Sequence, residues 1–191
     1  HEGESETTVI EGFLIKNGFA DEGGGILCDN TSPIIKDCYF LGTSAFFGGG
    51  ICALHSDVVV VGSIFDATTA HRGCYIFFSQ GGNPSIVSCE FMNTVSGPVS
   101  AIDAVDNVET LVFNCLMHDT RTVNGGFVMH SGVAINCTLS DNQFTESPSI
   151  VSTHNFVVIN SILYDNNLDG IDGRVYFSCL RRAVAFQYGC I

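Results

Sequence analysis

Five residues have the side chains that sugar chemistry needs. Asp103, Asp106 and Glu109 stand together where a strand is expected to end and a turn to follow, and His130 and His154 each stand seven residues before a small residue, Cys137 or Ser161. In a glycan-cleaving site one histidine would act as general base, while Asp103 or Asp106 would orient it or activate water. These five are the candidate catalytic residues. We favour a structural interpretation, in which the turn carboxylates are solvated and the histidines form a polar corner.

Charge and composition exclude several other chemistries. The chain of 191 residues has 7 basic and 20 acidic side chains, a formal net charge of -13. Nucleic acids and anionic membranes attract clustered Lys and Arg, so neither is an expected partner. A lyase of acidic sugars is also disfavoured, because no basic residue stands beside a carboxylate trio. No Cys-x-x-Cys or His-x-x-x-His spacing occurs and no apolar run is long enough to span a membrane, so we expect no metal, no cofactor and no membrane insertion.

A repeat along the chain predicts the elements that would position these residues. A small residue followed two positions later by a large apolar one recurs in steps of 26, 25, 26, 26, 22 and 24 residues, from position 12 to 38, 63, 89, 115, 137 and 161. This period is too short for helical repeats and is typical of one coil of a β-helix. The pairs are Gly12/Leu14, Cys38/Phe40, Ser63/Phe65, Cys89/Phe91, Cys115/Met117, Cys137/Leu139 and Ser161/Leu163.

Other columns keep the same register. An apolar residue stands three positions before the small residue, and a polar residue or glycine stands immediately before it, which predicts a bend with both flanking residues facing inward. Glycine clusters such as 23–25 and 48–50 mark the start of a further strand. The sequence therefore predicts an all-β, right-handed parallel β-helix of about seven coils over residues 1–167, with three short strands per coil. Residues 168–191 are expected to form a C-terminal tail that packs on the helix or caps it. The apolar column is Ile35, Val60, Ile86, Val112, Ala134 and Val158, and the bend column is Asp37, Gly62, Ser88, Asn114, Asn136 and Asn160.

One segment carries a family resemblance. Residues 23–40, Gly-Gly-Gly-Ile-Leu-Cys-Asp-Asn-Thr-Ser-Pro-Ile-Ile-Lys-Asp-Cys-Tyr-Phe, resemble the repeat of bacterial right-handed β-helix surface proteins of the polymorphic outer-membrane protein type. Pectate lyases share this architecture. The resemblance covers about residues 8–167 and implies the fold and a secreted or cell-surface location. It does not imply one activity, because the architecture carries many chemistries and many adhesins.

The repeat also gives the cysteines and threonines an interpretation. Cysteine at an inward position behaves as a small core residue, and the total of 9 leaves at least one thiol free if the others pair. Cys28 with Cys52, or Cys179 with Cys190, has a spacing that permits a bridge in an oxidising compartment. A column of Thr and Asn is interpreted as turn residues rather than as an ice-binding surface. That column is Thr43, Thr68, Thr94, Thr120, Asn142 and Asn166.

The outward side chains of one strand column are nearly all apolar. Solvated sheet faces normally alternate with polar residues, so a face of this kind should be covered. The tail or a second subunit would cover it, and we expect a homo-oligomer or an adjoining domain of a longer chain. The expected interface residues are Val59, Val61, Val87, Leu111, Phe113, Val133, Ile135, Val157 and Ile159.

Two hypotheses about function follow. The first is a noncatalytic extracellular module for surface adhesion, scaffolding or self-assembly through the apolar face. The alternative is a carbohydrate-active enzyme, a polysaccharide hydrolase or lyase, or a glycan-binding module, with a site near Asp103, Asp106, His130 and His154. We favour the noncatalytic module.

Overall fold

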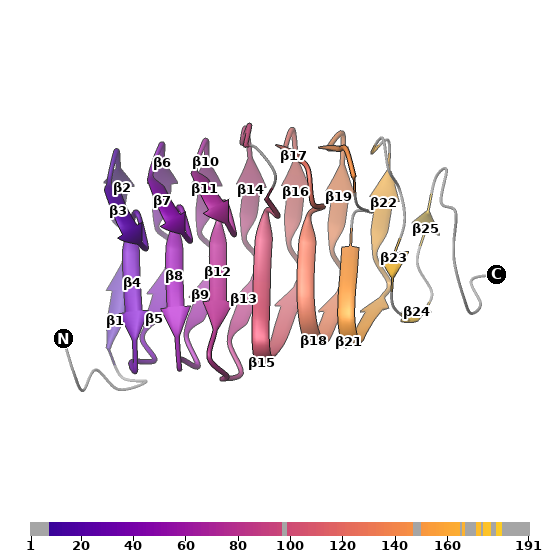
Figure 1. The fold of residues 1–191 in the computed structure, drawn as a ribbon, viewed down its shortest axis with the longest axis horizontal. Helices are drawn as coiled ribbons and strands as arrows, with labels where there is room; N and C mark the ends of the chain where they lie inside the picture. Colours follow the sequence, from indigo (N-terminus) through magenta and orange to yellow (C-terminus); the bar gives the residue numbers. More distant parts are fainter. Residues whose placement is uncertain are drawn as a thin grey trace.

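The computed structural model describes residues 8–96, 99–146, 150–164 and 166, and the short stretches 171–172, 174–176 and 179–180. For residues 151–154, and for the short stretches apart from Tyr176, only the backbone is described. All regular elements in these ranges are strands, which stack in parallel into a β-solenoid of about six turns (Figure 1). No helix in the described part of the chain is long and apolar enough to cross a membrane.

The largest sheet has 12 strands and two limbs. Three long strands, β15 (Ile102–Phe113), β18 (Phe127–Ile135) and β21 (Ile150–Ile159), extend across both limbs, and β23 (Ile171–Asp172) and β24 (Arg174–Tyr176) pair with the two ends of β21. The rest of the first limb is β1 (Val9–Glu11), β5 (Ile34–Lys36), β9 (Val59–Val61) and β13 (Ser85–Val87). The rest of the second limb is β4 (Ile26–Asp29), β8 (Ile51–Leu54) and β12 (Ile76–Ser79).

The remaining strands form three further parallel sheets among the described residues. Three strands make one sheet, β3 (Phe19–Glu22), β7 (Ser44–Phe47) and β11 (Thr69–Arg72), and two make another, β17 (Arg121–Thr122) and β20 (Gln143–Phe144). The 8-stranded sheet contains, in order, β2 (Leu14–Lys16), β6 (Tyr39–Leu41), β10 (Ile64–Asp66), β14 (Glu90–Met92), β16 (Leu116–His118), β19 (Thr138–Ser140), β22 (Ile162–Tyr164) and β25 (Cys179–Leu180).

The expected parallel architecture with three strands per coil is confirmed, and it is clearest in the coil of β15, β16 and β17 and in that of β18, β19 and β20. In earlier coils a turn separates the two limbs, so one coil has four short strands. From β15 onward that turn is reduced to a bend at Asp106 and Asn107, whose φ angles are 53° and 64°. In the expected tail region, β24 and β25 pair with β21 and β22, so this part of the segment adds to the stack.

The expected bend between the first limb and the 8-stranded sheet is also confirmed. Every residue of the bend column has a positive φ, from 47° at Asn160 to 59° at Gly62. This left-handed conformation turns the chain, so that the apolar residue two positions before the bend and the small residue just after it both face inward. Glycine adopts it freely, and Asn and Asp tolerate it better than other residues.

The predicted assignment of the first pair of the repeat, Gly12/Leu14, is wrong by one residue. Leu14 pairs with Tyr39 and Ile15 pairs with Phe40, so the inward residue of this coil is Ile15 and not Leu14. Gly12 belongs to the bend column, with a φ of 74°. Glycine fits both columns by size, and only the backbone conformation separates them.

The core lies inside the coils and consists of ladders of like residues. The apolar column from Ile35 to Val158 is fully buried, and Phe65 stacks on Phe40 and Phe91 with centroid distances of 4.5 and 5.1 Å. The expected core packing of cysteine is confirmed at Cys38, Cys89, Cys115 and Cys137. Contact with the Cys115 sulfur and burial raise the pKa of the Cys137 thiol, so this thiol stays protonated at neutral pH.

The structure agrees with the rejection of an ice-binding surface and decides the open question of the Cys28–Cys52 bridge. The Thr and Asn column is buried throughout, so it cannot form an ice-binding surface. It is an internal ladder, in which Asn142 Nδ2 donates to Asn166 Oδ1 at 2.9 Å and to the Met117 carbonyl at 3.0 Å. The bridge between Cys28 and Cys52 is absent, because Cys28 packs in the main core and Cys52 packs outside the second limb with Leu54 and Phe77. Cys190 lies outside the described residues.

The bend column gives a test of the backbone argument. Asn114 is exposed and has a φ of 54°. We expect Asn114→Val to lower the free energy of unfolding by about 1–2 kcal/mol, because a β-branched residue is strained at this φ, and Asn114→Gly to lower it by less. Urea denaturation of the three proteins measures this. Equal losses in the two variants would show that the lost hydrogen bond to Ser88, and not the backbone, sets the stability.

Candidate functional site

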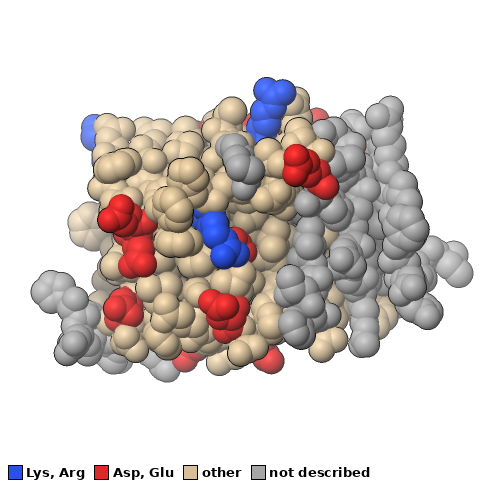
Figure 2. All heavy atoms as spheres, viewed as in Figure 1, with Lys and Arg blue, Asp and Glu red and all other residues tan. Residues whose placement is uncertain are grey.

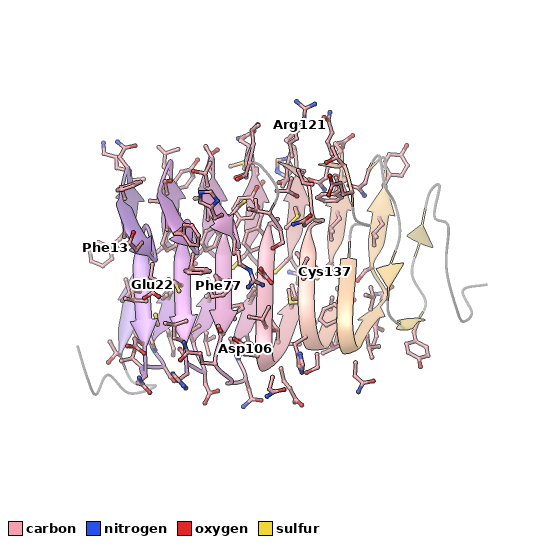
Figure 3. The ribbon with its side chains drawn as sticks, in the orientation of Figure 1. Phe13, Glu22, Phe77, Asp106, Arg121 and Cys137 are labelled. Carbon is pink, nitrogen blue, oxygen red and sulfur yellow. The ribbon has the colours of Figure 1, made fainter. Side chains whose placement is uncertain are left out.

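The candidate catalytic residues have different environments in the structure. Asp103 lies on β15 with its side chain outside the second limb, yet this side chain is only 4% exposed. Asp106 lies in the bend of β15, is exposed and accepts a hydrogen bond from the Ser79 hydroxyl. Glu109 is exposed and opposite Ser131 in the register of β18. In Figure 3, Asp106 lies at the lower end of the second limb.

The two histidines lie at an irregularity of the sheet. The register between β18 and β21 shifts between Met129 and Ser131, which brackets His130. His130 is half-buried, and the side chain of His154 lies outside the described residues. The stacking of the two rings therefore stays a prediction.

Asp103 forms an ion pair with Arg72, a residue that the sequence analysis did not include. Arg72 Nε donates to Asp103 Oδ2 at 2.8 Å, and the guanidinium carbon lies 5.3 Å from the centroid of the Phe77 ring. Phe77 in turn packs on Phe47, with 4.9 Å between the centroids of the two rings. In Figure 3, Phe77 lies near the middle of the second limb, and Figure 2 shows a basic side chain near the centre of this face with acidic side chains to its left and below.

Burial and the ion pair act in opposite directions on the protonation of Asp103. Burial raises the pKa of the Asp103 carboxyl, and the charge and hydrogen bond of Arg72 oppose that effect only in part. The carboxylate is thus buried, and Arg72 supplies the guanidinium that neutralises it. A buried carboxylate paired in this way serves the packing of the second limb and is poorly placed to activate water.

A second cluster of ionisable residues lies on the 8-stranded sheet. His118 Nε2 lies 2.9 Å from Glu90 Oε1, and His118 Nδ1 lies 2.8 Å from Asp119 Oδ2. Burial would lower the pKa of His118, but the hydrogen bonds and charges of the two carboxylates outweigh it and raise that pKa. With both ring nitrogens facing carboxylates, the protonated imidazolium is favoured, and it is a poor general base.

Asp119 also borders a shallow hollow of about 240 Å³. Asp119 and Asp141 occupy the same position of successive coils, each with a positive φ, and Arg121 and Gln143 stand beside them on β17 and β20. Among the described residues, no group of three or more His, Cys, Asp and Glu side chains is arranged to hold a metal ion. The cluster is a surface network of charges rather than a metal centre.

The expected interface residues lie together on the outside of the first limb. Leu111 and Phe113 are each 38% exposed, and the other seven are half-buried. Tyr176 of β24 is in register with Ile159 and continues the column. Ile64, Leu116 and Ile162 stand at the same edge of the adjoining 8-stranded sheet and are half-buried or exposed. We call this surface, from β9 to β24 on the first limb with these three residues, the apolar face.

Comparison of the chain with protein-family models, with curated proteins and with solved structures gives no match. The class of this protein rests on its parallel stacked sheets, which define a β-solenoid.

The ion pair of Arg72 and Asp103 predicts a pH-dependent cost of substitution. Arg72→Met leaves a buried carboxylate without its cation, so we expect a loss of about 3 kcal/mol in the free energy of unfolding at pH 7. Because the folded-state pKa of Asp103 is raised above its ordinary value of 3.8, its contribution to stability is full below that value and is lost as the pH rises through the folded pKa. Removing the cation raises the pKa further, so the cost of Arg72→Met should shrink as the pH falls toward 4.

Urea denaturation across this pH range tests the idea, with Arg72→Met/Asp103→Asn as the matched double variant. The double variant should recover part of the loss at pH 7, because no buried charge remains. A cost that is the same at every pH, with no recovery in the double variant, would mean that packing of the Arg72 side chain alone is responsible.

The second cluster predicts a histidine that keeps its proton above the usual pH range of histidine titration. The stabilising contribution of His118 is complete below the ordinary histidine pKa of 6.5 and is lost as the pH rises through the raised folded pKa. An NMR titration of the imidazole measures this pKa directly, and Glu90→Gln should lower it. If His118 titrates at or below its ordinary pKa, or ignores Glu90→Gln, the two carboxylates do not hold the ring as the structure shows.

Proposed function

We propose that this chain is a noncatalytic extracellular β-solenoid module that assembles with a second copy of itself through the apolar face. The observation that carries the proposal is the composition of that face. From β9 to the end of β21, the residues on either side of the buried column of the first limb are Val59, Val61, Ser85, Val87, Leu111, Phe113, Val133, Ile135, Val157 and Ile159, and Glu109, Ser131 and Asn155 border them on the long strands.

Charge restricts where two copies of the chain can meet. At a net charge of -13, two copies repel each other over most of their surfaces. The ten positions beside the buried column include no charged side chain and the exposed Glu109 stands at their border, whereas the first coils of the same limb carry the pair of Lys36 and Glu11 at 2.6 Å. Copies can therefore approach most closely on the apolar face, where burial of Val, Ile, Leu and Phe stabilises contact.

Geometry supports the same partner. Successive strands of one sheet lie about 4.8 Å apart, so the face from β9 to β24 is roughly 24 Å long. Two copies related by a twofold axis would place the same patch on itself, which is the commonest arrangement of homodimers. The edge residues Ile64, Leu116 and Ile162 extend the patch onto the 8-stranded sheet, with interruptions at Glu90 and Thr138 of the same column.

The environment of the candidate catalytic residues supports a noncatalytic module. Asp103 is buried against Arg72, and Asp106 is bound by Ser79. The extracellular location and the likeness to surface repeat proteins rest on the motif at residues 23–40 and remain part of the proposal.

Phe113→Glu tests assembly. A carboxylate in the middle of the apolar face would be buried on association, so the variant should dissociate at least tenfold more readily than the unchanged protein. Light scattering after size exclusion, over about 1 to 300 µM, measures the mass. Phe19→Glu is the matched control, because Phe19 is 86% exposed on β3 and lies outside this face. A monomer at every concentration, or equal behaviour of the two variants, would contradict the proposal.

A further inference from the structure

The wall of the solenoid is interrupted beside β11. The three-stranded sheet ends at this strand, because Val95 of the next coil forms its bridge with Arg121 instead of continuing the ladder. The Ser96 hydroxyl spans the gap and donates to the Ala70 carbonyl at 3.1 Å. The interruption leaves a hollow of about 260 Å³ on a sheet other than those that form the apolar face. Its lining residues are Ser44, Ala45, Thr69, Ala70, His71, Ser96 and Val99.

The hollow combines a small-residue base with hydroxyl groups. Ala45 and Ala70 are nearly fully buried and have only methyl side chains, so no bulky side chain fills the space at these two positions. Thr69 Oγ1 donates to Ser44 Oγ at 3.2 Å, and this contact fixes the two hydroxyls on neighbouring coils. The Ser44 hydroxyl accepts this bond and keeps its own proton to donate to a ligand.

An aromatic pair borders the hollow. The His71 ring, which lines the hollow, stacks on Phe46 with a centroid distance of 4.7 Å and an interplanar angle of 27°. Phe46 is 49% exposed, so this pair stands at the surface rather than in the core. The imidazole adds ring nitrogens that donate or accept hydrogen bonds, next to an apolar ring face.

Charge selects among ligands. None of the seven lining residues is Lys, Arg, Asp or Glu, so the imidazole of His71, when protonated, is the one lining side chain that can pair with an ionic ligand. The net charge of -13 repels anions as well. The volume is close to the lower end of the range of about 300–1,000 Å³ for small-molecule pockets, which suits a single ring.

We propose that this hollow binds one ring of a neutral carbohydrate. The hydroxyls of Ser44, Thr69 and Ser96 hydrogen-bond the sugar hydroxyls, and the ring of His71, which Phe46 holds by stacking, contacts an apolar C–H face of the sugar ring. Such a site joins a few placed polar groups to an aromatic wall, the arrangement that small-molecule sites generally use. The inference does not depend on self-assembly, because it concerns another sheet.

NMR titration of the ¹⁵N-labelled full chain tests the proposal. The probes are the methyl glycosides of glucose, galactose, mannose and N-acetylglucosamine, with galacturonate as the acidic comparison. We expect at least one neutral glycoside to shift the amide signals of Ser44, Thr69, His71 and Ser96, with a dissociation constant on the order of millimolar. Galacturonate should shift them less.

Variants assign the binding to the hollow. His71→Ala and Ser44→Ala should weaken binding about tenfold and about threefold, respectively, because they remove a ring contact and a hydroxyl. Phe19→Ala is the matched control, since Phe19 is an exposed aromatic residue of the same sheet that does not line the hollow. Unchanged amide signals elsewhere verify the fold of each variant.

The proposal is overturned if none of the four glycosides shifts these signals at about 50 mM, or if galacturonate binds as well as they do. It is also overturned if His71→Ala and Phe19→Ala bind alike. The mass measured by light scattering reports separately on assembly, so either proposal can fail without the other.

Discussion

Parallel hydrogen bonding between successive coils is the constraint on which the rest of this structure depends. Each coil pairs its backbone with the coil before and after, as in the run from Val9 through Ile34 to Val59. A side chain therefore has as its nearest neighbour the residue one coil away, about 4.8 Å along the axis. Like residues gather in columns, and a column is favourable only if its members tolerate close contact with their own kind. Apolar, sulfur and amide ladders satisfy this condition.

Residues one repeat apart in the sequence become neighbours in one column of the solenoid, so the repeat predicted these neighbours well. The inward column of Ile35 and Val60, the bends and the glycine corners could all be found from spacing. The prediction from spacing failed where the residue type suited two columns, or both the inner and the outer face of the wall. Gly12 is small enough for the inward position but occupies the bend, and Cys52 lies one coil after Cys28 along the chain yet on the other side of the wall. Backbone conformation and strand alternation decide these cases, and spacing alone does not contain them.

The contacts of the candidate sites could not be predicted because they run between columns. Arg72 and Asp103 are 31 residues apart, and Glu90 and His118 are 28 apart, which differs from the repeat of 22 to 26 residues. Register places Met92 beside His118, and only side-chain direction brings Glu90 to the ring. The hollow beside β11 arises for a similar reason, because one coil breaks the column at Val95. Chemistry in a solenoid therefore gathers where the repeat is broken or crossed.

Charge gives the two proposed surfaces a common cause. A solenoid in which coil after coil carries outward carboxylates accumulates like charge along its axis, and this repulsion opposes contact with other copies and with anions. The pairs of Lys36 with Glu11 and of Arg72 with Asp103 relieve it locally. The ten positions beside the buried column of the apolar face, and the seven residues that line the hollow beside β11, include no Lys, Arg, Asp or Glu. On a strongly acidic molecule, a neutral ligand or a second copy meets the least electrostatic repulsion at an uncharged surface. The distribution of charge therefore favours binding at these two places.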